Sequence, residues 1–265
     1  MFLSATTIAR NVVQLCYPVE RVIRGTIGLV DEFVITVDVL SKDNSVEYIK
    51  DLAVNINSEL RYEFVKVFEV RWDIKNIVGG SEFAIQTNVS FNFALGKFIL
   101  YVQLDECLHE KDFEYIKREL EGADSNDVDA FSMVRLYFYE DKDVIRDDWS
   151  VPIVRLFRRG TRVSCGDAMN SRGSNKVKEL DSFIYHYSRV GVDPSIMSRR
   201  VLALDKFFHP AEKLKKEDEL KPYDFKARNF DCMHKEGVDV GRKEVSGKFS
   251  LFTEEHPKVF EGYGD

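Results

Sequence analysis

The sequence contains no long apolar run. None of its 265 residues lies in a stretch of about 18 consecutive apolar residues, the length that a membrane-spanning helix needs. The first residues, MFLSATTIARN, have neither the basic start nor the extended apolar core of a secretory signal peptide. We therefore expect a soluble, cytoplasmic protein with no transmembrane segment.

Cysteine is also scarce. The four cysteines lie far apart and form no CxxC pair, which favours buried, reduced thiols over disulfides or a zinc site. They are Cys16, Cys107, Cys165 and Cys232. Dense lysine and arginine tracts are missing as well, and the formal net charge is -7. This composition argues against a protein whose main task is to bind nucleic acid.

No internal repeat or low-complexity tract interrupts the chain, which excludes repeat architectures. A hydrophobic content of 44% is ordinary for a globular protein, and 265 residues can bury a substantial core. We expect one domain over residues 1–205 and an irregular or helical extension, residues 206–265, that packs on it. Within the extension, KLKKEDELKPYD predicts a surface helix that ends at Pro222.

The most informative stretch is FILYVQLDECLHEKD, residues 98–112. Its apolar start, Phe98 to Val102, predicts a strand buried on both faces, and Asp105 and Glu106 follow where that strand ends. Ligands of open α/β sheets bind at the carboxyl ends of the strands, and paired carboxylates suit Mg²⁺ or Mn²⁺ bound to a diphosphate. The alternative is a solvated turn that carries two acids.

Earlier segments repeat this pattern of a strand, a polar turn and a helix. LSATTIARN, residues 3–11, predicts a first strand and its turn. Residues 33–37 predict a buried strand that ends in Asp38, and a helix begins near Ser45 with Glu47 in its first turn. This succession predicts an α/β domain with a mostly parallel sheet. We also expect strands over 64–72 and 129–139, helices over 80–95 and 112–120, and a flexible loop over 172–175.

Charge is distributed unevenly along the chain. From Gln103 to Asp148 there are fifteen acidic and six basic residues, a local balance of -9. From Arg155 to Arg189 there are eight basic and three acidic residues, a balance of +5. Such a contrast suits a site that binds a cation together with a polyanionic diphosphate. The alternative is that residues 155–162 form an exposed strand and turn.

Several segments, taken in order, resemble one known family. They are LSATTIARN, VDEFVITVDVLSKDNSVEYI, FAIQTNVSFNFALGKFILYVQLDECLHEKDFEYI, GDAMN, IYHYSRVGVDPSIMSRR and EEHPKVF. Their order and spacing resemble the nucleotide-sugar glycosyltransferases of family 2, which have the GT-A fold. The narrower resemblance is to a branch with a Gln-x-Asp-Glu variant of the DxD motif and a His-Tyr pair about eighty residues later.

The resemblance implies a Rossmann-like GT-A fold and an inverting transfer of a sugar from a nucleoside diphosphate sugar, preferably a UDP-sugar, to an acceptor hydroxyl. It also implies Mn²⁺ or Mg²⁺ as a cofactor. Asp105 matches the last acid of the DxD motif, and His186 matches an imidazole ligand of the ion. Because Gln103 replaces the first acid, Glu106, phosphates and water would complete the coordination. Taken alone, His186 on a strand indicates a core residue.

The same resemblance places nucleotide contacts at the ends of the first two strands. Ala5, Thr6 and Arg10 match the opening loop, and Asp38 matches the acid that faces uracil or ribose. Val39 stands where many members have a second acid, so the identity of the base stays open, and a helix-approach cap is the other interpretation of Asp38. The remaining expected nucleotide-binding residues are Gln86, Gln103 and Leu104.

Asp167, in CGDA, lies in the segment where the family has its catalytic base, and the preceding glycine lets the backbone approach a substrate. Glu106 is a second candidate catalytic acid. Asp181 and Asp193 are the alternatives to Asp167 as the base. A turn aspartate after a glycine, without a catalytic role, is the other interpretation of Asp167.

The resemblance favours a glycan or a lipid-linked sugar as the acceptor. Two alternatives stay open: a viral enzyme of the host cytoplasm that glycosylates hydroxymethylated DNA bases, and a catalytically inactive glycosyltransferase-like binding protein, since Gln103 and Val39 replace acids. A nucleic-acid-binding module would instead use the basic segment with Phe157, Tyr185 and Tyr187 as stacking platforms. The sequence leaves the donor sugar and the oligomeric state undecided.

Overall fold

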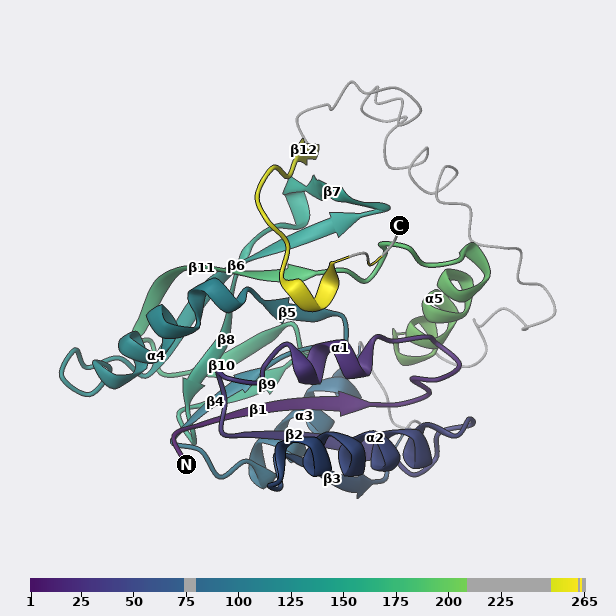
Figure 1. Ribbon diagram of the computed structural model, residues 1–265, viewed down its shortest axis with the longest axis horizontal. Helices are drawn as coiled ribbons and strands as arrows, with labels where there is room; N and C mark the ends of the chain where they lie inside the picture. Colours follow the sequence, from purple (N-terminus) through teal and green to yellow (C-terminus); the bar gives the residue numbers. More distant parts are fainter. Residues whose placement is uncertain (74–79, 209–248, 262, 264–265) are drawn as a thin grey trace.

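The computed structural model describes residues 1–73, 80–208, 249–261 and 263. Within them, one large sheet forms the centre of the molecule and helices lie on its faces (Figure 1). The order of eight of its strands is β12-β7-β6-β8-β4-β1-β2-β3, and β11 joins β6 to β5 beside that path. The helices are α1 (Val19–Arg24), α2 (Ser45–Leu60), α3 (Ser81–Phe93), α4 (Phe113–Glu121) and α5 (Pro194–Phe208), with short 3-10 turns η1 (Glu110–Asp112), η2 (Asp147–Trp149) and η5 (Lys258–Phe260). The strands are β1 (Leu3–Ala9), β2 (Glu32–Asp38), β3 (Val65–Val70), β4 (Phe98–Tyr101), β5 (Glu106–Leu108), β6 (Ala130–Tyr139), β7 (Asp141–Arg146), β8 (Pro152–Arg158), β9 (Arg162–Cys165), β10 (Asn170–Gly173), β11 (Val177–His186) and β12 (Phe249–Leu251).

The amino-terminal half of the sheet is parallel. β1 pairs with β2 on one side and with β4 on the other, and β3 pairs with β2. Every residue of β2 and β4 is buried, as expected for apolar strands that are covered on both faces. Because these strands run in one direction, their carboxyl ends meet at one edge of the sheet. The predicted α/β architecture, a sheet flanked by helices as in the GT-A fold, is confirmed.

Helices cover both faces of this parallel half. Ile49 of α2 belongs to the large core cluster together with Leu100 of β4. On the other face, Phe91 of α3 packs against Tyr101 and Phe157, with ring centroids 6.0 and 5.1 Å apart. Leu100 and Tyr101 are neighbours in one strand, so their side chains point to opposite faces. The strand therefore contributes to both layers of the core.

The second half of the sheet is largely antiparallel. β8 lies antiparallel between β4 and β6, and β7 and β12 continue from β6 to the outer edge. β11 runs parallel to β6 and antiparallel to the short β5. The register between β11 and β5 places His186 opposite Glu106. Two segments that are far apart in the sequence thus meet where the parallel strands end.

Most expected elements lie within a few residues of their predicted bounds. The strand expected over 64–72 is β3, and the helices expected over 80–95 and 112–120 are α3 and α4. The flexible loop expected over 172–175 is wrong in its first half, because Arg172 and Gly173 belong to β10. A Cβ at position 173 would lie 2.0 Å from the carbonyl oxygen of Thr161, so the hairpin needs glycine there. The helix expected near 213–224 lies outside the described residues.

The eight-strand path of the large sheet ends in β3 and β12, and β5 ends the branch that runs through β11. On β3, Lys66 forms an ion pair with Glu32, and Glu69 pairs with Lys50. β12 pairs with β7, and Phe260 of η5 stacks on Tyr187 with ring centroids 4.4 Å apart. The described part of the expected extension therefore contacts the sheet.

The cysteines differ in exposure. Cys107 is buried, Cys165 is partly buried and Cys16 is exposed, and all three are free thiols. Cys232 lies outside the described residues. The expectation of buried thiols is correct for Cys107 and wrong for Cys16. In the described ranges, no helix has the length and apolar character needed to cross a bilayer.

Candidate active site

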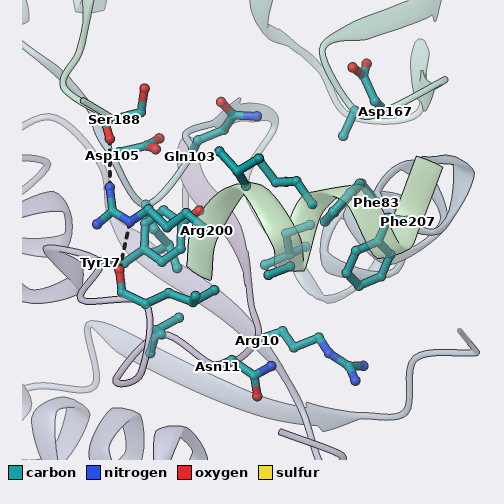
Figure 2. Close-up of a pocket in the computed structure, with 18 of the residues that line it drawn as sticks. Arg10, Asn11, Tyr17, Phe83, Gln103, Asp105, Asp167, Ser188, Arg200 and Phe207 are labelled. Carbon is teal, nitrogen blue, oxygen red and sulfur yellow. Dashed lines mark hydrogen bonds between the residues drawn. The ribbon is translucent and has the colours of Figure 1, made fainter. Parts of the chain in front are cut away.

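A cavity of about 1020 Å³ opens at the edge where β1 and β4 end. Its walls are the end of β1 and the following loop, the turn between β4 and β5, the tip of the β9–β10 hairpin, the end of β11, and α5. Figure 2 shows α5 crossing the cavity, with Arg10 and Asn11 on one side and Gln103, Asp105 and Ser188 on the other. Ligand pockets usually measure about 300 to 1,000 Å³, so a molecule of nucleotide-sugar size can enter.

An acidic and imidazole cluster lies at the ends of β4 and β11. Asp105 and His186 are 7% and 6% exposed, and both line the cavity. The Nδ1 atom of His186 is 3.7 Å from Oδ1 of Asp105 and 3.4 Å from Oε1 of Glu106. This buried nitrogen has no hydrogen-bond partner among the described residues, and the ring of Tyr137 covers the imidazole at 4.6 Å. The imidazole is therefore held in place by packing and presents a nitrogen to the carboxylates.

Glu106 faces the protein interior rather than the cavity. Its Oε1 accepts a hydrogen bond of 3.1 Å from Nη2 of Arg155, and its Oε2 accepts one of 3.0 Å from the backbone N–H of Gln103. Burial disfavours the charged carboxylate, but the Arg155 guanidinium and His186 outweigh it and hold the pKa of Glu106 well below its usual range. With both oxygens engaged, Glu106 supports the turn that carries Asp105.

The donor set at this cluster fits a divalent cation that arrives with an anionic substrate. A buried imidazole nitrogen without a partner faces the Asp105 carboxylate across 3.7 Å, a separation that lets both groups bind one ion. Among the described residues, no group of three or more His, Cys, Asp or Glu side chains could hold a metal by itself. Mg²⁺ is commonly bound by one or two protein carboxylates with phosphates and water in the other positions, which matches this incomplete set.

Tyr17 and Arg200 close one side of the same cluster. The guanidinium of Arg200 lies 4.4 Å from the Tyr17 ring and donates to the carbonyl oxygens of Leu15, Cys16 and Ser188. Figure 2 shows Arg200 reaching from α5 toward Tyr17 and Ser188. Burial and the nearby Asp105 carboxylate raise the pKa of Tyr17 to about 12. Tyr17 is therefore a neutral hydroxyl at physiological pH.

A second polar group lies where β1, β2 and β3 end. Arg10 pairs with Asp38, and its guanidinium is 5.8 Å from the ring centres of both Trp72 and Phe207. Asp38 is fully buried and accepts hydrogen bonds from the backbone N–H groups of Leu40 and Trp72 at 3.0 and 3.1 Å. The buried indole N–H of Trp72 has no acceptor among the described residues. This part of the cavity therefore combines two aromatic rings, the guanidinium of Arg10 and the unpartnered indole N–H of Trp72.

Asp167 is at the tip of the β9–β10 hairpin and lines the cavity. Gly166 and Ala168 on either side of it have φ angles of 62° and 66°. Its Oδ1 accepts a hydrogen bond of 3.2 Å from the backbone N–H of Met169. Of the three candidate bases, Asp167 alone lines this cavity, because Asp181 is exposed on β11 and Asp193 is exposed just before α5.

The structure brings together some of the predicted site residues and separates others. Those that line the cavity are Arg10, Gln103, Leu104, Asp105, Asp167 and His186. Ala5 and Thr6 do not line it, because both are enclosed inside β1, and Thr7 and Ile8 face the cavity instead. Asp38 does not line the cavity and contacts its wall through Arg10 and the backbone of Trp72. Gln86 is buried on α3, where its amide donates to Glu82 at 2.7 Å. Glu106 lies behind the wall.

Sequence reasoning missed most of α5 and its contacts. Arg200 and Phe207 of this helix and Tyr17 and Trp72 from the loops all line the cavity. A helical pattern of apolar residues over 197–208 was the available signal, with Met197, Leu204 and Phe207 recurring at helical spacing. That pattern indicates a packed face, but it does not say which cavity the helix covers.

Four of the eight cations of the basic segment form ion pairs with carboxylates. Arg155 is 1% exposed and bonded to Glu106, so the alternative of an exposed strand is wrong at this position. Arg158 pairs with Asp124 at 2.6 Å and Asp129 at 3.2 Å. The remaining pairs are Lys176 with Asp127 and Lys178 with Glu119. Acidic residues from the preceding segment thus offset part of the positive charge that the sequence indicates.

No protein family and no curated protein matches the chain by sequence. Among solved structures, S. aureus TarS matches at 16% identity and a TM-score of 0.44, over 77% of this chain and 39% of that one. Its fragment 1–349 in complex with UDP-GlcNAc matches at 16% identity and a TM-score of 0.43, over 77% and 65%. The same fragment in complex with UDP matches at 14% identity and a TM-score of 0.42, over 91% and 76%. The chain spans less than two thirds of the TarS chains in the first two comparisons.

Proposed function

We propose that the protein is a glycosyltransferase that moves a sugar from a nucleoside diphosphate sugar, most readily a UDP-sugar, to a hydroxyl of a glycan or lipid-linked acceptor, with inversion. The observation that carries this proposal is the meeting of Asp105 and His186, 3.7 Å apart, at the carboxyl edge of a parallel sheet and inside a cavity of about 1020 Å³. A diphosphate bound with a divalent cation matches that combination of carboxylate, imidazole and space.

The nucleoside of the donor would lie where β1, β2 and β3 end. There, Trp72 and Phe207 supply aromatic faces, and Arg10 supplies a guanidinium for ribose or phosphate oxygens. The unpartnered indole N–H of Trp72 is a donor for a carbonyl of the base or for a hydroxyl of the ribose. This arrangement supports a nucleotide but does not select among bases.

Asp105 and His186 would hold Mn²⁺ or Mg²⁺. Bound there, the ion would take charge from the departing diphosphate. Asp167, which lines the cavity, would be the general base. Its carboxylate would accept the proton of the acceptor hydroxyl as that oxygen bonds to the anomeric carbon and the bond to the diphosphate oxygen breaks. A single displacement of this kind inverts the configuration at the anomeric carbon.

A thermal-shift experiment with nucleoside diphosphates, in the presence and absence of Mn²⁺, tests the donor class. A ligand at 100 times its Kd stabilises the folded protein by about 2.7 kcal/mol, so binding raises Tm measurably. We expect Asp105→Asn to remove the Mn²⁺-dependent part of the shift and to leave the metal-independent part. Asp51→Asn, which changes an exposed carboxylate of α2, is the matched control and should behave as the wild type.

The possible outcomes separate the parts of the proposal. If no nucleoside diphosphate shifts Tm, the donor class is wrong. If Mn²⁺ has no effect on the shift of the wild type, the metal assignment is wrong. If binding occurs but no UDP is released from UDP-sugars with any acceptor, the protein is a glycosyltransferase-like binding protein without activity.

A further inference from the structure

Arg155, on β8, is a fully buried charge behind the cavity wall. Its side chain is 1% exposed, and it does not itself line the cavity. A buried guanidinium is costly unless its donors are used. Both Nη atoms of this one donate hydrogen bonds, whereas its Nε has no acceptor among the described residues. Each of its main partners belongs to a segment that forms the site. A residue that only neutralised the charge of Glu106 would not need partners in several segments of the site.

Three contacts of Arg155 reach three separate segments. Nη2 donates to Oε1 of Glu106 at 3.1 Å, in the turn that carries Asp105. Nη1 donates to the carbonyl oxygen of Ala168 at 3.0 Å, in the hairpin tip that carries Asp167. The guanidinium also lies 4.7 Å from the ring centre of Tyr101, the last residue of β4. One side chain thus connects the metal-binding turn with the tip that bears the base.

The bond to Ala168 acts at the place where the hairpin tip has its least favourable backbone. Ala168 is 2% exposed and has a φ angle of 66°, a left-handed conformation that an alanine adopts only when its surroundings impose it. The residue before it is Asp167, whose carboxylate accepts from the N–H of Met169. Arg155 and Asp167 therefore hold the two ends of one peptide group, the C=O of Ala168 and the N–H of Met169.

We infer that Arg155 is a positioning residue, which sets the hairpin tip with Asp167 against the turn with Asp105. The inference rests on the proposed function, in which Asp105 holds the metal ion at the departing diphosphate and Asp167 accepts the proton of the acceptor hydroxyl. Arginine suits the position because its planar fork holds two acceptors in fixed directions, whereas the three donors of a lysine ammonium rotate freely. Arg155 touches no reacting atom in this scheme and acts through Glu106 and Ala168.

A comparison of two variants separates positioning from charge neutralisation. Glu106→Gln removes the carboxylate and keeps the bond from Arg155 to the tip. The double variant Arg155→Met/Glu106→Gln removes both buried charges, which favours folding, and loses the bond to the tip. Arg158→Met is the matched control, since Arg158 lies on the same strand, pairs with Asp124 and Asp129, and packs over Phe98 at 4.9 Å.

We expect kcat of the double variant to fall about 10- to 100-fold below that of Glu106→Gln, because a shift of about 1 Å in a reacting group has such an effect. The Kd of the donor, measured by calorimetry with UDP, should change less than about threefold, since the nucleoside side of the cavity is not touched. Hydrogen exchange at the Met169 amide should accelerate only in the double variant. Arg158→Met should keep kcat within about twofold and leave that exchange unchanged.

Equal kcat and equal Met169 exchange in the double variant and in Glu106→Gln would overturn the inference and reduce Arg155 to a counter-ion. If the wild type turns over no nucleotide sugar, the proposed function fails, and the exchange measurement alone decides about Arg155. Faster exchange in the double variant then supports its hold on the tip, and unchanged exchange refutes it.

Discussion

At the scale of single residues, the turn that presents Asp167 to the cavity contains a backbone conformation that a free chain would avoid. A left-handed conformation costs a non-glycine residue about 1 to 3 kcal/mol, and Ala168 adopts one directly after Asp167, with a φ angle of 66°. The carboxylate is thus presented to the cavity by a tip whose geometry is fixed before any substrate binds. Such preorganisation suits a group that must accept a proton at one position.

Asp167→Asn tests the proposed base. Asparagine keeps the shape of the side chain and an oxygen for the Met169 N–H, but it cannot accept the proton. We expect kcat to fall by about 10²- to 10⁴-fold with donor affinity unchanged. Proton NMR of the transferred sugar should show the anomeric configuration opposite to that of the donor.

Asp193→Asn is the matched control for that variant, because Asp193 also accepts from a backbone N–H two residues ahead, at 2.7 Å from Ser195. Its kcat should stay near that of the wild type. If Asp167→Asn keeps more than about a tenth of the rate, a loss below about 1.4 kcal/mol, the role passes to Asp181 or Asp193. Retention of configuration would remove the need for a base on the acceptor side.

Glu32 gives a prediction for the pH dependence of stability. Burial opposes its ionisation, but the ion pair with Lys66 at 2.7 Å and hydrogen bonds from Ser4 and the Leu95 N–H outweigh this effect and lower its pKa. A carboxylate with a lowered pKa in the folded state stabilises the protein above its unfolded pKa, about 4.3, and this contribution is lost as the pH falls through the folded value.

We therefore expect Glu32→Gln to lower the free energy of unfolding by about 1 to 3 kcal/mol at pH 7. The difference from the wild type should shrink as the pH falls below about 4.3. Urea denaturation at several pH values measures it. Glu47→Gln, on the exposed side of α2, should change stability at pH 7 by less than about 0.5 kcal/mol. A difference for Glu32→Gln that does not vary with pH would contradict the linkage.

The geometry of strands explains which residues of the site could be predicted from the sequence. Asp105 was recognisable because an apolar run ends just before it. Ala5 and Thr6 were misplaced by a few positions, since a strand that is buried throughout shows no alternation that would tell which threonine faces the cavity. The partnership of Arg155 with Glu106 was not predictable, because it depends on β8 pairing with β4.

At the scale of elements, α5 is the part of the site that comes from furthest along the described chain. It packs Phe207 against Trp72 and Phe83, with ring centroids 5.8 and 4.5 Å apart. Hydrogen bonds from Arg200 connect the same helix to the loop after β1 and to the residues that follow β11. The ends of strands and helices followed from apolar runs and glycines, whereas the docking of α5 depends on long-range contacts that no local pattern specifies.

Arg200→Met tests whether these hydrogen bonds hold α5 against the sheet. The substitution leaves the carbonyl oxygens of Leu15, Cys16 and Ser188 without their donor, so we expect the free energy of unfolding to fall by about 2 to 4 kcal/mol. Amide exchange in α5 should accelerate more than in α2. Arg199→Met, at the next and more exposed position, should cost about 1 kcal/mol or less. An equal loss of unfolding free energy in the two variants would show that the hydrogen bonds of Arg200 do not hold α5 in place.

At the scale of the whole molecule, acidic and basic segments neutralise one another across the sheet. Arg158, Lys176 and Lys178 are each in contact with a carboxylate of the segment between α4 and β6 or of α4 itself. These ion pairs reduce the positive charge that the segment could offer to a phosphate backbone. This pairing is the observation that disfavours DNA as the acceptor.

Salt dependence tests the acceptor class. With a glycan acceptor, we expect turnover to change by less than about threefold between 50 and 200 mM salt, whereas a protein that makes 6 to 10 phosphate contacts loses about 10³- to 10⁵-fold in affinity over that range. Hydroxymethylated DNA and a neutral oligosaccharide are to be compared side by side. Transfer to the DNA with a steep salt slope would refute the glycan assignment.

The edge strands of the sheet have a consequence for the protein in solution. An open strand edge invites pairing with another chain, and short or charged edge strands resist it. β12 spans only Phe249–Leu251, and β3 carries the paired charges Lys66 and Glu69. These two edge strands thus discourage strand addition between molecules. Strand addition at β3 and β12 is therefore expected to be disfavoured in concentrated solutions, and replacing Glu69 with valine, which leaves the Lys66–Glu32 pair intact, should weaken that protection.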